Sequence, residues 1–352
     1  TAGIDFAKEH GFSLIIALDC GIKANDKVAY ANSLGIDFII CDHHLPGDTV
    51  PAAIAVLDPK QKDCDYPYDE LSGCGIGFKL VQAYCQFHQI DMDTILPLLD
   101  LVAVSIASDI VPLTGENRTL AYFGLQQLNS NPRPGFKALM NIAATKTDLS
   151  INEIVFAIGP RINAAGRIDD AKHAVNLLIA KDEQSAFDFC EIVDSKNTER
   201  REFDQSITLS ALQLIEENFD LHQKKSTVLF DASWHKGVIG IVASRLIEKH
   251  YKPTIILTES NGLAAGSARS VNGFDIYEAI SACSDLLIQY GGHKYAAGLT
   301  MQIDQIPAFQ EKFEEIVAAS IHDDSLQAEI AIECEMNLAE FSTKTYAVLK
   351  QF

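Results

Sequence analysis

The stretch SLIIALDCGIKANDKVAYANSLGIDFIICDHH, residues 13–44, decides the fold of the N-terminal half. It places two short apolar runs, 13–18 and 36–41, on either side of a helical segment that spans 24–34 and stops at a glycine. Short buried strands that alternate with helices are typical of a parallel, doubly wound α/β sheet. A further short strand is expected over 53–57. The first half of the chain is therefore predicted to contain such a sheet.

Beyond this sheet the chain is expected to be largely helical up to residue 218. The predicted helices are one that opens at 76–81, then 95–107, 117–128 and 169–180, and one or two long, partly exposed helices over 183–218 that join domains. A second α/β unit starts near Ser226. Its predicted strands are 227–230, 254–257 and the alternating run 328–334, and its predicted helices are 238–249 and 277–290.

The composition is that of an ordinary globular protein. With 352 residues, two or more compact units are favoured over one continuous core. No run of 18 apolar residues occurs, and the first ten residues lack the basic start and apolar middle of a secretory signal. The eight cysteines are scattered without a C-x-x-C pair. We therefore expect a protein of a reduced, cytoplasmic compartment that has no membrane partner.

The formal net charge of −20 argues against a protein that coats nucleic acid by electrostatic attraction alone. An enzyme of this charge that acts on nucleic acid has to hold phosphates locally, through metal ions and a few placed arginines. The charge also favours solubility, so by itself it leaves a nucleic-acid function open.

Acidic and imidazole side chains follow the predicted buried runs. Asp19 follows the first strand, Asp42, His43 and His44 follow the second, and Asp109 follows a later apolar run. An open α/β sheet places its site just past the carboxyl ends of its strands. Imidazole and carboxylate together suit Mn²⁺, Fe²⁺ or Zn²⁺, and two ions that share carboxylates could hydrolyse a phosphodiester. Asp19 and Asp109 are each equally well explained as a cap of a helix or turn; the coincidence of all three clusters favours a metal site.

Further clusters contain residue types that hold phosphate groups. In GPRINAAGR, residues 159–167, the side chains of Arg161, Asn163 and Arg167 could reach phosphate oxygens, and the alternative is a turn with surface arginines. In the second half, the segments are WHKGVIG at 234–240, GSARS at 266–270 and GGHKYAAG at 291–298. Their candidate residues are His235 near a helix N-terminus, Ser267, Arg269, Gly291, Gly292 and His293.

The run Gly73-x-Gly75-x-Gly77 has the glycines of a dinucleotide-binding loop. No strand-like run precedes it, so helix packing is the preferred interpretation.

These motifs resemble the RecJ family of the DHH phosphoesterase superfamily. LDCG at 18–21, DHHLPG at 42–47 and SDIVPL at 108–113 are similar to the second, third and fourth metal motifs of the superfamily. GPRINAAGR and the helical NTERR at 197–201 are similar to the RecJ branch. The three segments of the second half that contain candidate phosphate-binding residues, 234–240, 266–270 and 291–298, resemble the accessory DHHA1 domain. The resemblance covers essentially the whole chain.

The resemblance implies an α/β protein with four parts. These are a DHH-type parallel α/β catalytic domain over 1–192, a long connecting helix over 193–221, a smaller α/β DHHA1 substrate-binding domain over 222–323, and the start of an OB-type β domain over 324–352. The family's first metal motif, D-x-D, should precede residue 1. We therefore expect the sequence as printed to be weak or inactive and an upstream segment to restore activity.

The activity implied by the resemblance is a processive 5′-to-3′ exonuclease for single-stranded DNA with a 5′-phosphate, in DNA repair and recombination. It would use two Mn²⁺ or Mg²⁺ ions, with single-strand-binding protein and a helicase as partners. Asp19 would bridge the ions, His43 and Asp109 would be further ligands, His44 would face the scissile phosphate and Asp42 would orient an imidazole. The implied substrate residues are Arg161, Asn163 and Arg167 in the cleft, Ser267 and Arg269 at the 5′-phosphate, His235, and Gly291, Gly292 and His293 along the strand.

Two alternatives belong to the same fold. One is a DHH–DHHA1 phosphodiesterase that degrades short oligoribonucleotides or cyclic dinucleotides; the long helical stretch 183–218 and the tail after 326 argue against it. The other is a catalytically inactive DNA-binding scaffold. An inactive relative has no reason to keep Asp19, both histidines and Asp109, so a metal-dependent exonuclease is favoured.

Overall fold

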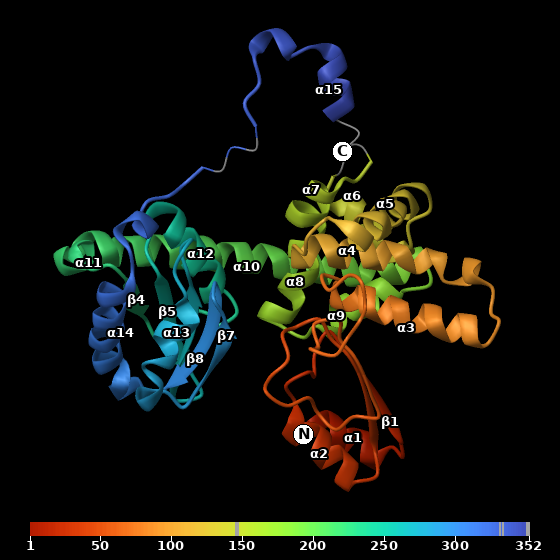
Figure 1. Ribbon diagram of the computed structural model, residues 1–352, viewed down its shortest axis with the longest axis horizontal. Helices are drawn as coiled ribbons and strands as arrows, with labels where there is room; N and C mark the ends of the chain where they lie inside the picture. The colour runs from red at the N-terminus through yellow and green to blue at the C-terminus, as the bar shows by residue number, and fades with distance from the viewer. Residues whose placement is uncertain (145–147, 331, 333, 350–352) are drawn as a thin grey trace. The chain divides into compact units, whose positions relative to one another are not determined.

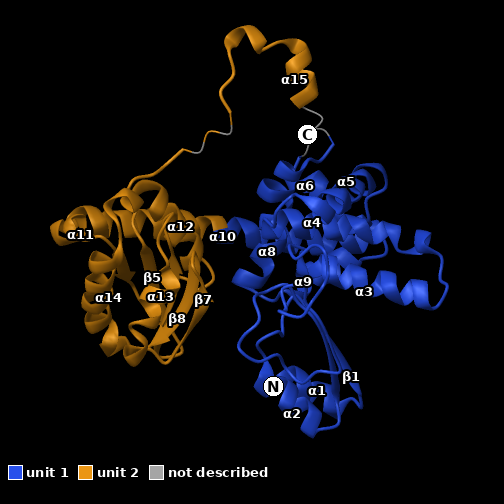
Figure 2. Ribbon diagram, viewed as in Figure 1, with its two compact units in different colours: residues 1–200 blue, residues 201–352 orange. Residues whose placement is uncertain are grey.

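The protein consists of two compact units, each with its own sheet and hydrophobic core. In this computed structural model, residues 1–144, 148–330, 332 and 334–349 are described. The first unit is Thr1–Arg200 and the second is Arg201–Phe352 (Figure 2). A single long helix, α10 (Glu183–Glu217), contains the boundary between them. No helix in the described ranges is long and apolar enough to cross a membrane.

The first unit begins with a three-stranded parallel sheet in the order β1-β2-β3. Its strands are β1 (Leu14–Leu18), β2 (Asp37–Cys41) and β3 (Ala55–Leu57). Their register pairs Leu18 with Cys41 and Cys41 with Leu57, so all three strands end at the same level. Helices α1 (Ala2–Glu9) and α2 (Asn25–Ser33) bury Ile4, Ala7, Val28 and Ala31 in one cluster with residues of β2. The predicted parallel α/β sheet is confirmed.

Helices form the rest of the first unit (Figure 1). They are α3 (Gly73–Phe87), α4 (Leu99–Asp109), α5 (Gly115–Ser130), α6 (Pro134–Ile142), α7 (Ile151–Glu153), α8 (Gly159–Ile168), α9 (Lys172–Ile179) and the start of α10. A π-helical turn, Ile154–Ile158, joins α7 to α8. Helix α4 lies in the core because its residues Val102–Val104, Ile106 and Ala107 are all buried. It ends at Asp109, which places this carboxylate at the end of a rigid element.

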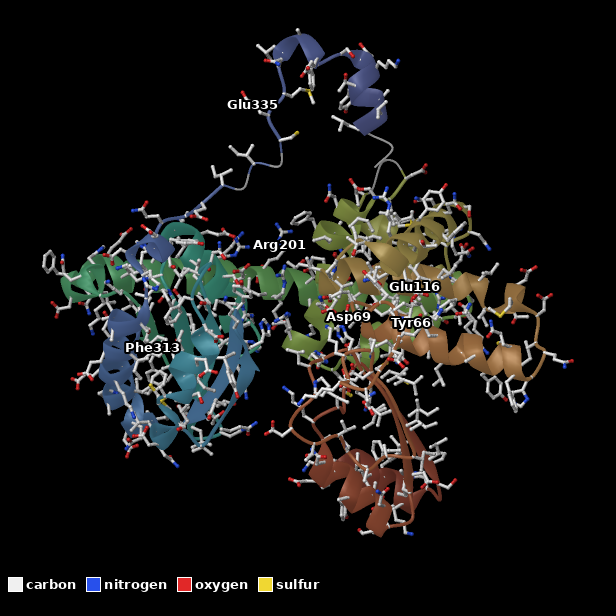
Figure 3. The ribbon with its side chains drawn as sticks, viewed as in Figure 1. Tyr66, Asp69, Glu116, Arg201, Phe313 and Glu335 are labelled. Carbon is white, nitrogen blue, oxygen red and sulfur yellow. The ribbon has the colours of Figure 1, made fainter. Side chains whose placement is uncertain are left out.

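Two side-chain networks fix loops to this helical part. Near the start of α4, the buried carboxylate of Asp100 accepts hydrogen bonds from Nε and Nη2 of Arg133, at 2.7 and 2.6 Å. In the loop before α3, the hydroxyl of Tyr66 donates to Glu116 of α5 at 2.6 Å (Figure 3). Lys79 of α3 donates to the other oxygen of Glu116 at 2.9 Å. The loop between β3 and α3 is thereby attached to two helices.

The second unit contains a five-stranded mixed sheet in the order β4-β5-β6-β8-β7. Its strands are β4 (Thr227–Phe230), β5 (Thr254–Ser260), β6 (Leu263–Arg269), β7 (Gln289–His293) and β8 (Ala296–Met301). Its helices are α11 (Phe219–Gln223), α12 (Ile239–Lys249), α13 (Ile276–Ser281), α14 (Ile306–Ser320) and α15 (Thr343–Leu349). Only the β4–β5 pair is parallel. Phe309 and Phe313 of α14 are fully buried in its core (Figure 3).

Two secondary-structure predictions in the second unit are wrong. The helix expected over 277–290 ends at Ser281, and β7 begins at Gln289. The apolar residues there have helical spacing, but pairing of Tyr290 with Leu299 in the β7–β8 hairpin outweighs this local preference. The described residues of 328–334 form no strand; residues 331 and 333 lie outside the described residues. Ile330 and Ile332 are exposed, so alternation alone does not give a strand its hydrogen-bonding partner.

Candidate metal centre

Three of the predicted metal ligands converge in the first unit. The Nε2 atom of His43 lies 3.1 Å from Oδ1 of Asp19 and 3.4 Å from Oδ2 of Asp109. Backbone hydrogen bonds from Asp19 N to Cys41 O and from Asp42 N to Leu57 O continue the sheet pairing into this region. Asp19 and His43 therefore come from adjacent strand ends, and Asp109 comes from the end of α4.

The imidazole of His43 is buried and surrounded by acceptors on its Nε2 side. Hydrogen bonding to Asp19 raises the pKa of His43, with a further contribution from Asp109, against the burial that lowers it. A divalent cation between these three groups would replace the proton on Nε2 of His43. The donor set of one imidazole and two carboxylates fits Mn²⁺. Ligand atoms of Asp19, His43 and His44 also lie within 4.8 Å of one another.

Asp42 organises the turn that carries both histidines. Its side chain is 1% exposed, and it accepts hydrogen bonds from the backbone N–H groups of Ile22, His43 and His44. Its Oδ1 also lies 2.7 Å from Nδ1 of His44. Burial raises the pKa of Asp42, but these hydrogen bonds outweigh it and lower the pKa below the usual range. With Nδ1 bound to Asp42, the exposed ring of His44 has Nε2 left for a ligand or a phosphate.

Two residues at the centre have left-handed backbone conformations. Asp19 has φ 64°, and Ile110, directly after Asp109, has φ 57°. Non-glycine residues in this region are uncommon and cost conformational free energy. Asp19 is one of the two aspartates whose carboxylates face His43, and Ile110 directly follows the other, Asp109.

Gly73, the first residue of α3, makes room for the Asp19 side chain. A Cβ atom at position 73 would lie 2.1 Å from Oδ1 and 2.6 Å from Cγ of Asp19. A Cβ at Gly75 would lie 3.3 Å from its nearest neighbour, Ser72 Oγ. The glycine run therefore serves packing, as predicted, and its first member sets the position of a ligand.

The variant Gly73→Ala is expected to displace the Asp19 carboxylate and to weaken Mn²⁺ binding about 10- to 100-fold, the size of effect typical when a residue that orients a metal ligand is changed. Isothermal titration with Mn²⁺ measures it, and Gly75→Ala in the same helix is the matched control. Equal Mn²⁺ affinity for the two variants would contradict the role of Gly73.

A cleft of about 630 Å³ extends from the carboxylates to α8. Asp19, Asp109, Asn163 and Arg167 all line it. Helix α8 and the turn before it pack against α4, because Ala165 of α8 and Ile158 of the turn are buried in one cluster with Val104 and Ala107. The structure thus brings two of the predicted phosphate-binding side chains to the metal-binding residues.

Arg161 lies differently from Asn163 and Arg167. Its Nε donates to Asp194 of α10 at 2.7 Å, and its Nη1 donates to the carbonyl of Ala157 at 2.7 Å. The guanidinium is thereby fixed between α8 and α10. The alternative of a turn with surface arginines is wrong, because the nine-residue motif lies in helix α8.

Three residues near the centre were missed by sequence reasoning. Asp58 directly follows β3, is 2% exposed, and accepts the Lys60 N–H at 2.8 Å. Burial raises its pKa. Cys74 lines the cleft, and burial raises the pKa of its thiol to about 11, which keeps it protonated. Ser108 Oγ is buried without a protein partner beside Asp109. Only Asp58 had a signal in the sequence, namely its place after a strand.

In the second unit, strand register places the predicted phosphate residues on one face of the sheet. Ser267 pairs with Gly298, which pairs with Gly291, while Arg269 pairs with Ala296, which pairs with His293. Residues opposite each other or two apart in antiparallel strands share a face. Ser267, Arg269, Gly291 and His293 therefore lie on the same side, and Gly292 between them has φ 151°.

The N-terminus of α12 approaches this face. A Cβ atom at Gly240 would lie 2.8 Å from Ser267 Oγ and 3.0 Å from Nη2 of Arg269. Arg269 also donates from Nη1 to Ser267 Oγ at 3.2 Å. A helix N-terminus, a hydroxyl and a guanidinium together can bind an anion. His235, before α12, accepts the Gly237 N–H and stacks on Phe203 at a centroid distance of 5.0 Å.

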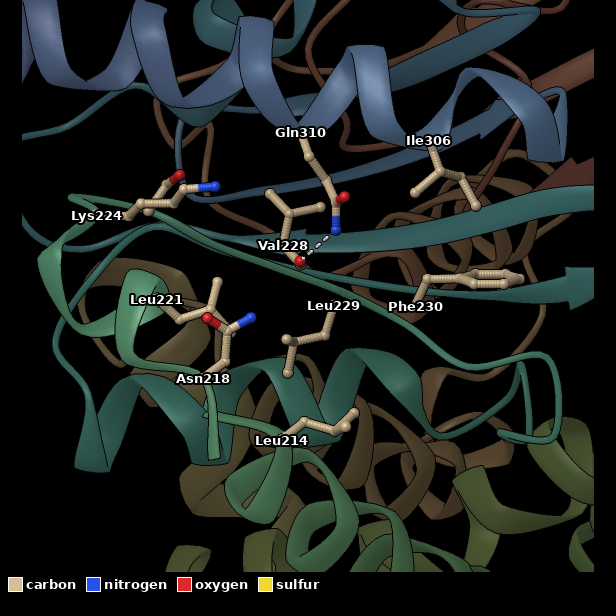
Figure 4. A pocket seen from close by; sticks show the side chains of 10 residues that line it. Leu214, Asn218, Leu221, Lys224, Val228, Leu229, Phe230, Ile306 and Gln310 are labelled. Atoms are coloured by element: carbon tan, nitrogen blue, oxygen red, sulfur yellow. Dashed lines mark hydrogen bonds between the residues drawn. The ribbon is translucent and has the colours of Figure 1, made fainter. Parts of the chain in front are cut away.

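A separate groove of about 380 Å³ in the second unit has a different character (Figure 4). Its walls include Leu214, Leu221, Leu229, Phe230 and Ile306, and Gln310 closes one side by donating to the carbonyl of Val228 at 2.9 Å. Most of the residues that line it are apolar.

Comparisons with known proteins match this architecture. Residues 4–106 match the DHH family, N-terminal domain, and residues 223–319 match the DHHA1 domain. The single-stranded-DNA-specific exonuclease RecJ of Bacillus subtilis (strain 168) is 40% identical over 314 residues, 88% of this chain and 39% of the relative. The protein of the same name from Escherichia coli (strain K12) is 34% identical over 368 residues, 99% of this chain and 63% of the relative.

Solved structures of RecJ proteins are also similar to this chain. A structure of exonuclease RecJ bound to manganese is 30% identical with a TM-score of 0.76, and the match covers 92% of this chain and 79% of that chain. The chain belongs to the RecJ family. RecJ of Thermus thermophilus in complex with Mn²⁺ is 31% identical with a TM-score of 0.80, over 90% of this chain and 47% of that chain. The predicted family is confirmed, and so is the α/β fold with DHH and DHHA1 domains. This RecJ-family chain spans 39% of the B. subtilis relative and 63% of the E. coli relative.

Proposed function

We propose that the protein hydrolyses single-stranded DNA from its 5′ end, as a two-metal exonuclease with Mn²⁺ or Mg²⁺. The observation that carries this proposal is the approach of His43 Nε2 to both Asp19 and Asp109 in a cleft that Asn163 and Arg167 also line. Metal ligands and phosphate-binding side chains then occupy one cavity, as hydrolysis of a phosphodiester requires.

Asp19, His43 and Asp109 would hold metal, with Asp19 as the bridging carboxylate. Their oxygen and imidazole nitrogen donors fit Mn²⁺, and solved RecJ structures are complexes with Mn²⁺ and with Mg²⁺. Bound ions would supply Lewis-acid stabilisation of the charge that develops on the phosphate. The space at Gly73 leaves room for the Asp19 carboxylate beside His43.

The remaining side chains would bind and orient the phosphate. Nε2 of His44 would face the scissile phosphate while Asp42 holds the other ring nitrogen. Asn163 and Arg167 would donate to phosphate oxygens along the cleft wall. Arg161, fixed by Asp194, would add positive charge from the same helix.

The second unit would provide the end recognition that makes the enzyme an exonuclease. Ser267 and Arg269, next to the start of α12, would bind the 5′-terminal phosphate. Gly291, Gly292, His293 and His235 would hold the strand. Glycines opposite Ser267 leave that face of the sheet open, which supports a role in backbone contact.

The cellular setting forms part of the same proposal. All eight cysteines are free, which fits a reducing cytoplasm. Single-stranded DNA is the substrate named for the curated relatives. Single-strand-binding protein and a helicase would be partners in repair and recombination.

The test is digestion by the longest natural form of the protein and, in parallel, by residues 1–352. The substrates are 5′-phosphorylated single-stranded DNA, the matching blunt duplex and a diribonucleotide, each with Mn²⁺. We expect mononucleotides from the 5′ end of the single strand and a spared duplex. Preference for the diribonucleotide would favour a short-oligonucleotide phosphodiesterase. Binding of single strands without hydrolysis in either form would favour a scaffold.

A further inference from the structure

One large aromatic side chain is exposed in the turn that leads into the cleft-lining helix α8. Phe156 lies in the π-helical turn before α8 and is 79% exposed. Its neighbours Ile154 and Ile158 in the same turn are 0% and 1% exposed and form part of the core. The turn is therefore anchored on one side and presents the Phe156 ring on the other.

The π-helical turn runs directly into α8, whose residues Asn163 and Arg167 line the cleft. Asn163 and Arg167 are four residues apart and share one face of α8, and Phe156 precedes Asn163 by seven residues. All three are exposed, whereas Ala164 and Ala165 on the other side of α8 are buried. Phe156 therefore lies about two helical turns before Asn163 in the same segment. Asn163 and Arg167 line the same cleft as Asp19 and Asp109.

Side chains that donate to phosphates, followed by an exposed aromatic ring, would suit a single DNA strand. Every nucleobase has a face that can stack on a phenyl ring, so such a platform works without sequence preference. A docking site for a folded protein would be a larger apolar patch. The other exposed residues on this face, Asn152, Asn163 and Arg167, are polar, which favours nucleic acid over a protein partner.

We propose that Phe156 stacks on a nucleobase of the single strand whose phosphate is held at Asn163 and Arg167. This inference rests on the proposed function and adds a residue that grips the strand beside the metal centre. Phe156 acts on the base, while Asn163 and Arg167 act on the backbone, so strand binding combines stacking with phosphate contacts.

The test measures binding of a fluorescent, 5′-phosphorylated oligonucleotide to the full-length protein in EDTA, so that no hydrolysis occurs. Loss of a stacked base by the change Phe156→Ala should raise Kd about 5- to 140-fold. Phe156→Trp should restore binding because it keeps an aromatic face, whereas Phe156→Leu should not. The matched control is Phe87→Ala, which removes an 84% exposed ring at the end of α3; its Kd should stay within about twofold of the wild type.

An abasic scan of the oligonucleotide makes the test specific. For one nucleotide position, removal of the base should weaken the wild type and leave Phe156→Ala unaffected, because the two changes remove the same contact. The inference is overturned if Phe156→Ala binds within twofold of the wild type, or if no abasic position abolishes the difference between the two proteins. If either of these two results is found while the wild type still digests single strands, only the role of Phe156 is rejected and the proposed function is retained. Absence of both binding and digestion would reject the function itself.

Discussion

Replacing Asp19 by asparagine is expected to lower kcat on 5′-phosphorylated single-stranded DNA by about 10²- to 10³-fold, the cost typical of losing one group that stabilises developing charge. Asparagine has nearly the same shape and also tolerates the left-handed conformation, so the fold at this position should persist. What is lost is the negative charge 3.1 Å from His43 Nε2, which a shared metal site requires. Single-turnover digestion of the full-length protein at saturating DNA measures the effect.

Asp26→Asn is the matched control for this change. Asp26 is an exposed aspartate in the first turn of α2, so its replacement should leave kcat within about twofold. The same experiment at rising Mn²⁺ concentration separates weaker metal binding from slower hydrolysis. A fully active Asp19→Asn enzyme would reject Asp19 as a metal ligand.

Removal of the Arg133 side chain is expected to cause the largest loss of stability. The change Arg133→Met keeps most of the volume but leaves the Asp100 carboxylate, 1% exposed, without its two charged donors. Breaking a buried ion pair from one side costs about 3–5 kcal/mol, because a buried charge then has no partner. Urea denaturation should report this decrease in the free energy of unfolding.

Lys137→Met, one turn away on α6, provides the comparison. Lys137 pairs with Glu183 on the surface, where both side chains are more than half exposed. Exposed pairs contribute at most about 1 kcal/mol. A loss for Arg133→Met no greater than that for Lys137→Met would show that Asp100 is neutralised in another way.

The sheet of the first unit was predictable because each strand is a short apolar run followed by a polar turn. The ends of β1 and β2 agree with the predicted runs 13–18 and 36–41 within one residue. The β7–β8 hairpin was not predictable in the same way. Its pairing of Gly291 with Gly298 and Tyr290 with Leu299 is tertiary, and the local spacing of apolar residues there is helical.

The closeness of Asp19 and His43 followed from a rule about strand ends, whereas Asp109 was predicted only from its place after an apolar run that forms helix α4. Other parts of the centre depend on atomic packing that composition does not encode. The closeness of Gly73 to Asp19 requires knowing how α3 meets the end of β1. The exposure of Phe156 required knowing which side of a π-helical turn is buried.

The left-handed conformations of Asp19 and Ile110 limit which substitutions the metal centre can accept. Each conformation costs about 1–2 kcal/mol relative to a right-handed one, and a β-branched isoleucine is poorly suited to it. Glycine or asparagine at position 110 would relieve that cost, yet it would also loosen the end of the helix that carries Asp109. A substitution at position 110 that gains stability would therefore disturb the carboxylate that faces His43.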